Sequence, residues 1–149
     1  MQKRVISEIR INTKAKLILE AFLKLEHLQA WWGVDSCFIQ PKDNGLYCLT
    51  WLQSADGIKF ISSGRIKLYN PRSHLHIEDM LYINSEKPIL GPFTLNIDVE
   101  EKSNYSILRV IQGGFIKGGG EIWDWYYKAV SDGWPEALII IKKYLEKFN

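Results

Sequence analysis

Apolar and polar residues follow two different periods along this chain, and the order of these periods predicts the fold. Residues 5–11 alternate between apolar and polar, as in a strand with one buried face. Over residues 15–32 the apolar positions recur every three or four residues, which is helical periodicity. A break between Lys24 and His27 would divide this segment into two short helices, and Thr13 is the expected N-cap of the first.

After Gly33 the alternation returns, which predicts a meander of strands. The strands are separated by segments rich in Pro, Gly, Asn and Asp, which favour turns; these lie at 41–45, 55–57, 70–73, 88–92 and 103–104. The last strand is expected to end at Gln112, before a glycine-rich, flexible connection over residues 113–120.

The C-terminal part is helical again, with apolar residues at three- and four-residue steps from Trp123 to Phe148. We expect Gly133 and Pro135 to lie in the first turn of a fresh helical segment. Strands are thus segregated from helices, which predicts an α+β fold with an antiparallel sheet. About six to seven strands should form a bent sheet wrapped around the long C-terminal helix. A length of 149 residues suits one domain, 1–149.

Composition excludes several classes of function. The formal charge is only +2 and the basic residues are scattered, so nucleic acid is not an expected partner. No apolar run is long enough to span a membrane and no secretory signal is recognisable, so we expect a cytoplasmic protein. Cys37 and Cys48 match neither a redox pair nor a zinc site, and we expect free thiols and no cofactor.

Several short motifs, in this order and spacing, resemble one known family. They are Leu28-Gln29-Ala30-Trp31-Trp32, Ser63-Gly64-Arg65-Ile66, Asn70-Pro71-Arg72-Ser73-His74-Leu75, Gln112-Gly113-Gly114-Phe115 and Asp132-Gly133-Trp134. The chain resembles the activators of the heat-shock-protein-90 ATPase, within the START-like (SRPBCC) superfamily and its helix-grip fold. Relatives often carry a histidine where this chain has Gln112.

The resemblance implies a cavity between sheet and C-terminal helix that in many members holds an apolar ligand. Parity and periodicity place an aromatic-rich set of side chains inward, and these are the candidate cavity residues: Tyr47, Trp51, Phe60, Phe93, Leu95, Leu108, Val110, Trp123, Tyr127, Trp134 and Leu138. The alternative is that the same residues form a solid core. Several Trp and Tyr together favour a pocket with polar groups, because their N–H and O–H need partners.

Other polar residues are weaker candidates. His74 and His76 share a strand face but alternate with Leu75 and Ile77, so they should point outward, and no metal site is expected. Asp79 has the parity of a buried residue and would then be a candidate acid or base; a solvated carboxylate is the alternative. The loop Gly118-Gly119-Gly120 lacks the features of a phosphate-binding motif.

These observations favour a non-catalytic domain that encloses a small hydrophobic or amphipathic ligand. Two alternatives stay open: a protein-interaction role of the chaperone-activating type that the resemblance implies, and an enzyme of the polyketide cyclase type. The chain contains no recognisable catalytic motif. Whether it is a monomer or a homodimer is also open.

Overall fold

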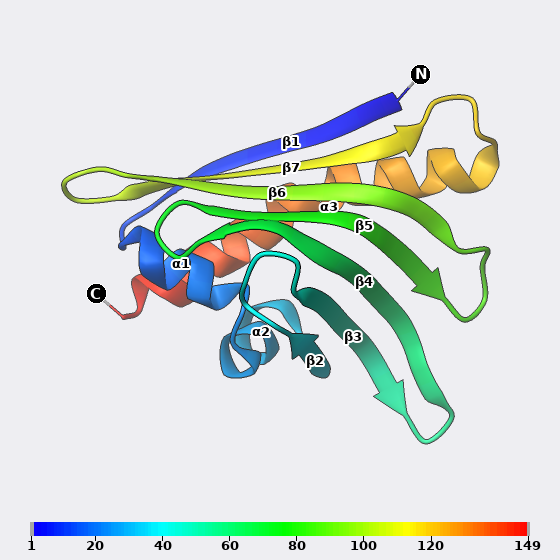
Figure 1. Cartoon of the computed structure of the whole chain (residues 1–149), viewed down its shortest axis with the longest axis horizontal. Coiled ribbons are helices and arrows are strands. Elements are labelled where there is room, and N and C mark those ends of the chain that lie inside the picture. Colours follow the sequence, from blue (N-terminus) through cyan, green and yellow to red (C-terminus); the bar gives the residue numbers. More distant parts are fainter. Residues whose placement is uncertain (1, 149) are drawn as a thin grey trace.

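The computed structural model describes residues 2–148, which form seven strands and three helices. In chain order these are β1 (Gln2–Ile11), α1 (Ala15–Ala21), α2 (Leu25–Trp32), β2 (Ser36–Ile39), β3 (Leu46–Ser54), β4 (Gly57–Asn70), β5 (His74–Asn84), β6 (Leu90–Glu101), β7 (Ser106–Ile116) and α3 (Glu121–Glu146). Figure 1 shows a strongly curved sheet with α3 running along one face and with α1 and α2 near the C-terminal end of α3.

All neighbouring strands are antiparallel, in the order β1-β7-β6-β5-β4-β3-β2. The strands β2 to β7 follow one another as a meander. The last of them, β7, pairs with the first strand, β1, along the whole length of β1. The predicted helix-grip architecture is therefore confirmed, including the two short helices after the first strand. No helix among residues 2–148 is both long and apolar enough to cross a membrane.

Helix α3 is one continuous helix of 26 residues, so the predicted fresh helical start at Gly133 and Pro135 is wrong. Pro135 lies inside the helix, where it cannot donate the usual bond to the carbonyl of residue 131. Burial compensates for this loss: Trp134 and Leu138, on either side of the proline, pack into the core with Ile141 and Leu145.

The start of α1 also differs from the prediction. Thr13 is buried but makes no cap, and its hydroxyl has no hydrogen-bond partner within the described residues. The helix begins at Ala15, whose N–H donates to Glu101 Oε1 at 2.9 Å. A carboxylate at the end of β6 thus replaces the local cap, an arrangement that sequence spacing cannot reveal.

A bulge in β5 changes the side-chain alternation. The register between β5 and β6 shifts between Ile77 and Met80, and Asp79 has φ +54°. Met80 is consequently buried, whereas Asp79 is exposed and accepts a hydrogen bond from Arg65 Nη2 at 2.7 Å. The inward orientation considered for Asp79 is wrong, and the solvated alternative describes it.

Strand β7 continues four residues past its predicted end, to Ile116, so Gly113 and Gly114 belong to the sheet. At Gly114 the backbone has φ +99°, and a Cβ atom there would lie 2.7 Å from the carbonyl oxygen of Pro92. Glycine is required here because the two backbones approach too closely for any side chain.

We expect Gly114→Ala to lower the free energy of unfolding by about 1–3 kcal/mol, since both the φ angle and the contact with Pro92 are unfavourable. Urea denaturation followed by circular dichroism measures the change. The matched control is Gly133→Ala, in α3, where a Cβ meets nothing within 4 Å. This control should gain roughly 0.5–1 kcal/mol from helix propensity. Equal effects of both substitutions would contradict the close approach.

Candidate functional site

A cavity of about 280 Å³ lies between α3 and the concave face of the sheet. Its walls come from α2, from strands β3 to β7, and from α3. All the lining residues are uncharged: Trp32, Tyr47, Leu49, Trp51, Ser62, Met80, Tyr82, Leu95, Gln112, Tyr126, Ala129, Val130, Gly133, Trp134 and Ala137. The site is therefore mostly apolar, with a few hydroxyl, indole and amide groups.

The cavity exists because α3 carries small residues where it crosses this part of the sheet. Ala129, Gly133 and Ala137 are spaced four residues apart and lie along one side of the helix. None of them has a side chain long enough to reach the opposite wall. Ala129 and Gly133 are exposed, so they mark the side on which the cavity meets solvent.

Three indole rings meet at one end of the cavity. Trp32 lies between the other two, with ring centroids 5.4 Å from Trp51 and 5.5 Å from Trp134. The indole N–H of Trp51 donates to the carbonyl oxygen of Trp32 at 3.1 Å. This hydrogen bond satisfies the polar group of Trp51, so the indoles contribute mainly apolar surface to this end of the cavity.

The tandem tryptophans of α2 have different roles. Trp31 is buried and donates from Nε1 to the carbonyl oxygen of Ala21 at 2.8 Å, which holds α2 against α1. Trp32 stacks on it, with centroids 4.8 Å apart, and reaches the cavity. The hydroxyl of Tyr47 fixes the same region, because it donates to the carbonyl oxygen of Phe22 at 2.6 Å.

Tyr82 and Tyr126 form the wall at the other end, where their rings stack with centroids 4.4 Å apart. Burial raises the pKa of Tyr126, the nearby side-chain amide of Gln112 partly offsets this effect, and the neighbouring Tyr82 raises the pKa further. Burial also raises the pKa of Tyr82, partly offset by the hydrogen bond from Asn84. Both phenols therefore stay protonated well above neutral pH and offer O–H groups.

Gln112 is the polar centre of the cavity. It is buried on β7, and its Oε1 accepts a hydrogen bond from Trp134 Nε1 at 2.9 Å. An indole N–H can only donate, so this contact determines which end of the amide faces Trp134. Nε2 must then face the other way, toward the phenol of Tyr126, where it makes no hydrogen bond of good geometry to any described residue.

The structure brings four of the predicted side chains together on the cavity wall and places the others elsewhere. The four are Tyr47, Trp51, Leu95 and Trp134. Four others belong to the packed hydrophobic core: Phe93, Leu108, Val110 and Leu138. Of the half-buried remainder, Phe60 stacks on Tyr82, Trp123 packs on Phe93, and Tyr127 packs on Phe115. That any of the eleven contacts a ligand stays a prediction.

Several lining residues were not among those predicted. Gln112 has the same parity as Leu108 and Val110, so the inward side of β7 could have included it. The four-residue spacing of Ala129, Gly133 and Ala137 was a second usable signal. Neither Asp79 nor the loop Gly118–Gly120 lines the cavity.

A double-mutant cycle tests the contact between Gln112 and Trp134. Gln112→Met removes the acceptor while keeping a similar length, and leaves the buried indole N–H without a partner. We expect a loss of about 1–3 kcal/mol in the free energy of unfolding. Made on a Trp134→Phe background, the same substitution should cost about 1 kcal/mol less, because no donor remains to be left unpaired. Additive effects in urea denaturation would contradict the hydrogen bond.

Solved structures with little sequence similarity share this fold. The Aha1 dimer from Colwellia psychrerythraea matches with a TM-score of 0.71 and 11% identity, over 97% of this chain and 96% of that chain. Protein MLL2253 from Mesorhizobium loti matches with a TM-score of 0.76 and 13% identity, over 99% of both chains. DynU16, a protein in the dynemicin biosynthetic locus, matches at 0.71 and 12%, over 96% of this chain and 47% of its own.

At such identities the likeness establishes the fold alone. No curated protein sequence matches this chain significantly. The model of one protein family, described as Activator of Hsp90 ATPase homolog 1-like protein, matches residues 12–146. This match covers almost the whole chain and includes the tandem tryptophans of α2, Gln112 on β7 and Trp134 on α3. The chain therefore belongs to the Activator of Hsp90 ATPase homolog 1-like protein family.

Proposed function

We propose that this protein binds a small, neutral, ring-containing molecule with a hydrogen-bond acceptor in the cavity between α3 and the sheet. The observation that carries the proposal is the buried amide group of Gln112, whose Nε2 lies near the phenol of Tyr126 but makes no well-formed hydrogen bond in the described part of the chain. A buried unpaired donor costs about 1–3 kcal/mol. An acceptor on a bound molecule would remove this cost.

The size and charge of the cavity narrow the ligand class. A volume of about 280 Å³ lies just below the range of typical small-molecule sites, which is roughly 300–1,000 Å³. It suits a compact ring system better than a long acyl chain. No cationic side chain is among the lining residues, so a carboxylate or phosphate would be desolvated without a counter-charge. A neutral carbonyl or ether oxygen avoids this cost.

The walls favour flat rings. The indoles of Trp32, Trp51 and Trp134 lie at one end and the stacked phenols of Tyr82 and Tyr126 at the other. Aromatic pairs gain about 0.5–1.5 kcal/mol beyond the burial of their area. An aromatic ketone is the simplest molecule that combines these features.

A pair of matched probes tests the polar contact. 2-Acetylnaphthalene and 2-isopropylnaphthalene have similar shape, but only the ketone has an acceptor. We expect the ketone to bind the wild-type protein more tightly, by roughly two- to tenfold, the range that one net hydrogen bond provides. Gln112→Leu should abolish the difference while leaving the hydrocarbon bound. Isothermal titration calorimetry measures both affinities.

A second pair of variants tests the location of the ligand. Ala137→Phe fills the cavity from α3 and should weaken both probes at least tenfold. Glu136→Phe adds the same ring one residue away, at an exposed position outside the cavity wall, and should leave binding unchanged. No uptake of either probe by the wild-type protein, or equal uptake by both variants, would contradict the proposal.

Family membership favours a second candidate function, interaction with an Hsp90-type chaperone. The test is the ATPase rate of the chaperone from the same cell, with and without this protein. A rise that persists in Ala137→Phe would assign the activity to the surface of the domain rather than to the cavity. An unchanged rate and no co-purification would exclude this candidate.

An enzyme of the cyclase type receives less support. Asp79, the candidate acid or base, is exposed and paired with Arg65, and it is not on the cavity wall. Proton transfer to a bound molecule would instead fall to the phenols of Tyr82 or Tyr126, whose pKa values are raised by burial. These groups are better suited to donating hydrogen bonds than to abstracting protons at neutral pH.

A further inference from the structure

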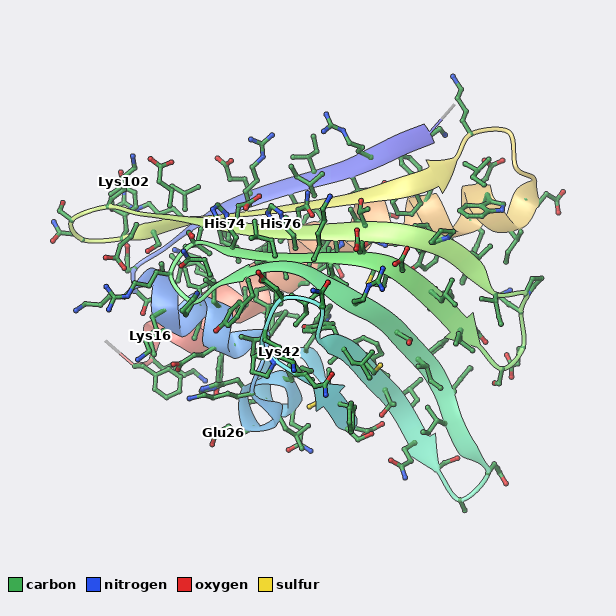
Figure 2. The ribbon with its side chains drawn as sticks, viewed as in Figure 1. Lys16, Glu26, Lys42, His74, His76 and Lys102 are labelled. Atoms are coloured by element: carbon green, nitrogen blue, oxygen red, sulfur yellow. The ribbon has the colours of Figure 1, made fainter. Side chains whose placement is uncertain are left out.

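Two histidines and an aspartate form a cluster on the face of the sheet opposite to the cavity. His74 and His76 are two residues apart on β5 and alternate with Leu75 and Ile77, which are buried beneath the sheet. The predicted outward orientation of the two imidazoles is therefore correct. Figure 2 shows them next to each other along the sheet.

The third member comes from the neighbouring strand. Asp98 on β6 is the register partner of His74. Its Oδ1 lies 2.8 Å from His74 Nδ1 and 2.7 Å from His76 Nε2. No metal site was predicted here, because the sequence offers no third ligand close to the two histidines. Strand pairing supplies a ligand twenty-four residues away from His74.

We propose that His74, His76 and Asp98 bind one divalent transition-metal ion of the zinc type. The three ligand atoms lie within 4.8 Å of one another, and they are the only such group of three within residues 2–148. All three side chains are partly exposed, with 43%, 23% and 34% of their surfaces accessible, so an ion can reach them from solvent.

The donor atoms select the class of metal. Two imidazole nitrogens and one carboxylate oxygen suit zinc, copper, nickel or cobalt, whereas calcium and magnesium prefer oxygen alone. Three protein ligands leave at least one coordination position to water, as in open zinc sites. Burial tends to raise the pKa of Asp98, but the hydrogen bonds from His76 and His74 outweigh it and keep the pKa below its usual value. The carboxylate is thus ionised at neutral pH.

Coordination of one ion requires small changes in the two N···O distances and a closer approach of the two imidazole nitrogens, which lie at most 4.8 Å apart. Ligand atoms about 2.0–2.1 Å from a tetrahedral ion are roughly 3.3 Å apart. The two N···O distances must therefore lengthen by about half an ångström. Each imidazole nitrogen that now donates a hydrogen bond to Asp98 must instead offer its lone pair to the ion. In a neutral ring the proton then moves to the other ring nitrogen, so no net proton is released.

Among the register partners of the cluster on β4 and β7, one carries an opposing charge. On β4 the register partners of His74 and His76 are Asn70 and Leu68, which are uncharged. On β7 the partner of Asp98 is Arg109, whose cation would weaken the binding of a divalent ion. Despite this neighbouring cation, the Asp98 carboxylate accepts its hydrogen bonds from the two imidazoles and therefore faces them.

Calorimetric titration of the metal-free full chain with zinc chloride tests the proposal. We expect one ion per chain, and at least a tenfold loss of affinity in His76→Gln and in Asp98→Asn. The asparagine can still accept both hydrogen bonds, so that variant should remain folded, which circular dichroism checks. His27→Gln removes the third histidine, which contacts Tyr144 far from the cluster, and should bind zinc like wild type.

The free thiols of Cys37 and Cys48 are the competing zinc ligands. Cobalt substitution distinguishes them, because a nitrogen and oxygen site lacks the thiolate charge-transfer absorption that a cysteine ligand would give. The proposal fails if Cys37→Ser or Cys48→Ser abolishes zinc binding. It also fails if His76→Gln and Asp98→Asn, both folded, bind zinc as tightly as wild type, or if the wild-type chain binds none.

Discussion

Burial of the apolar stripe of α3 against the concave face of the sheet is the constraint on which the other features depend. Trp134, Leu138, Ile141 and Leu145 are nearly inaccessible to solvent. Each such side chain contributes about 1.5–3 kcal/mol of transfer free energy. A flat sheet could not enclose a helix of this length, and the bulges in β4 and β5 increase its twist and bending. Strand β1 pairs with β7 and so forms the edge of the sheet that contacts the helix.

The same helix both completes the core and leaves a hollow, and its sequence divides these roles along its length. Large apolar residues dominate the C-terminal half, where the helix seals the core. Small residues interrupt the stripe in the middle, where the helix passes the indoles and the phenols. Gln112 lies where these regions meet and anchors Trp134 with one end of its amide. The packing of α3 and the polarity of the cavity thus depend on the same residue.

The order of strands and helices followed from periodicity, because the two structures impose different spacings on apolar residues, and the helix-grip arrangement followed from the family resemblance. Local deviations from regular structure were not predictable. The bulge at Asp79 reverses the face of a single residue, and the N-cap of α1 comes from Glu101, far away in the sequence. Strand parity indicated which residues face the helix, but it could not separate core from cavity. That distinction depends on where the small residues of α3 lie opposite the sheet, which is a property of the helix and the sheet together.

The row of Ala129, Gly133 and Ala137 has a consequence for divergence within the family. A side chain added at Gly133 would meet open space and no existing atom, so substitutions there need not disturb the hold of the helix on the sheet. Substitutions at these three positions could therefore enlarge, reshape or fill the cavity while the fold is kept. The size and shape of the cavity can therefore change between related proteins even when their backbones scarcely differ.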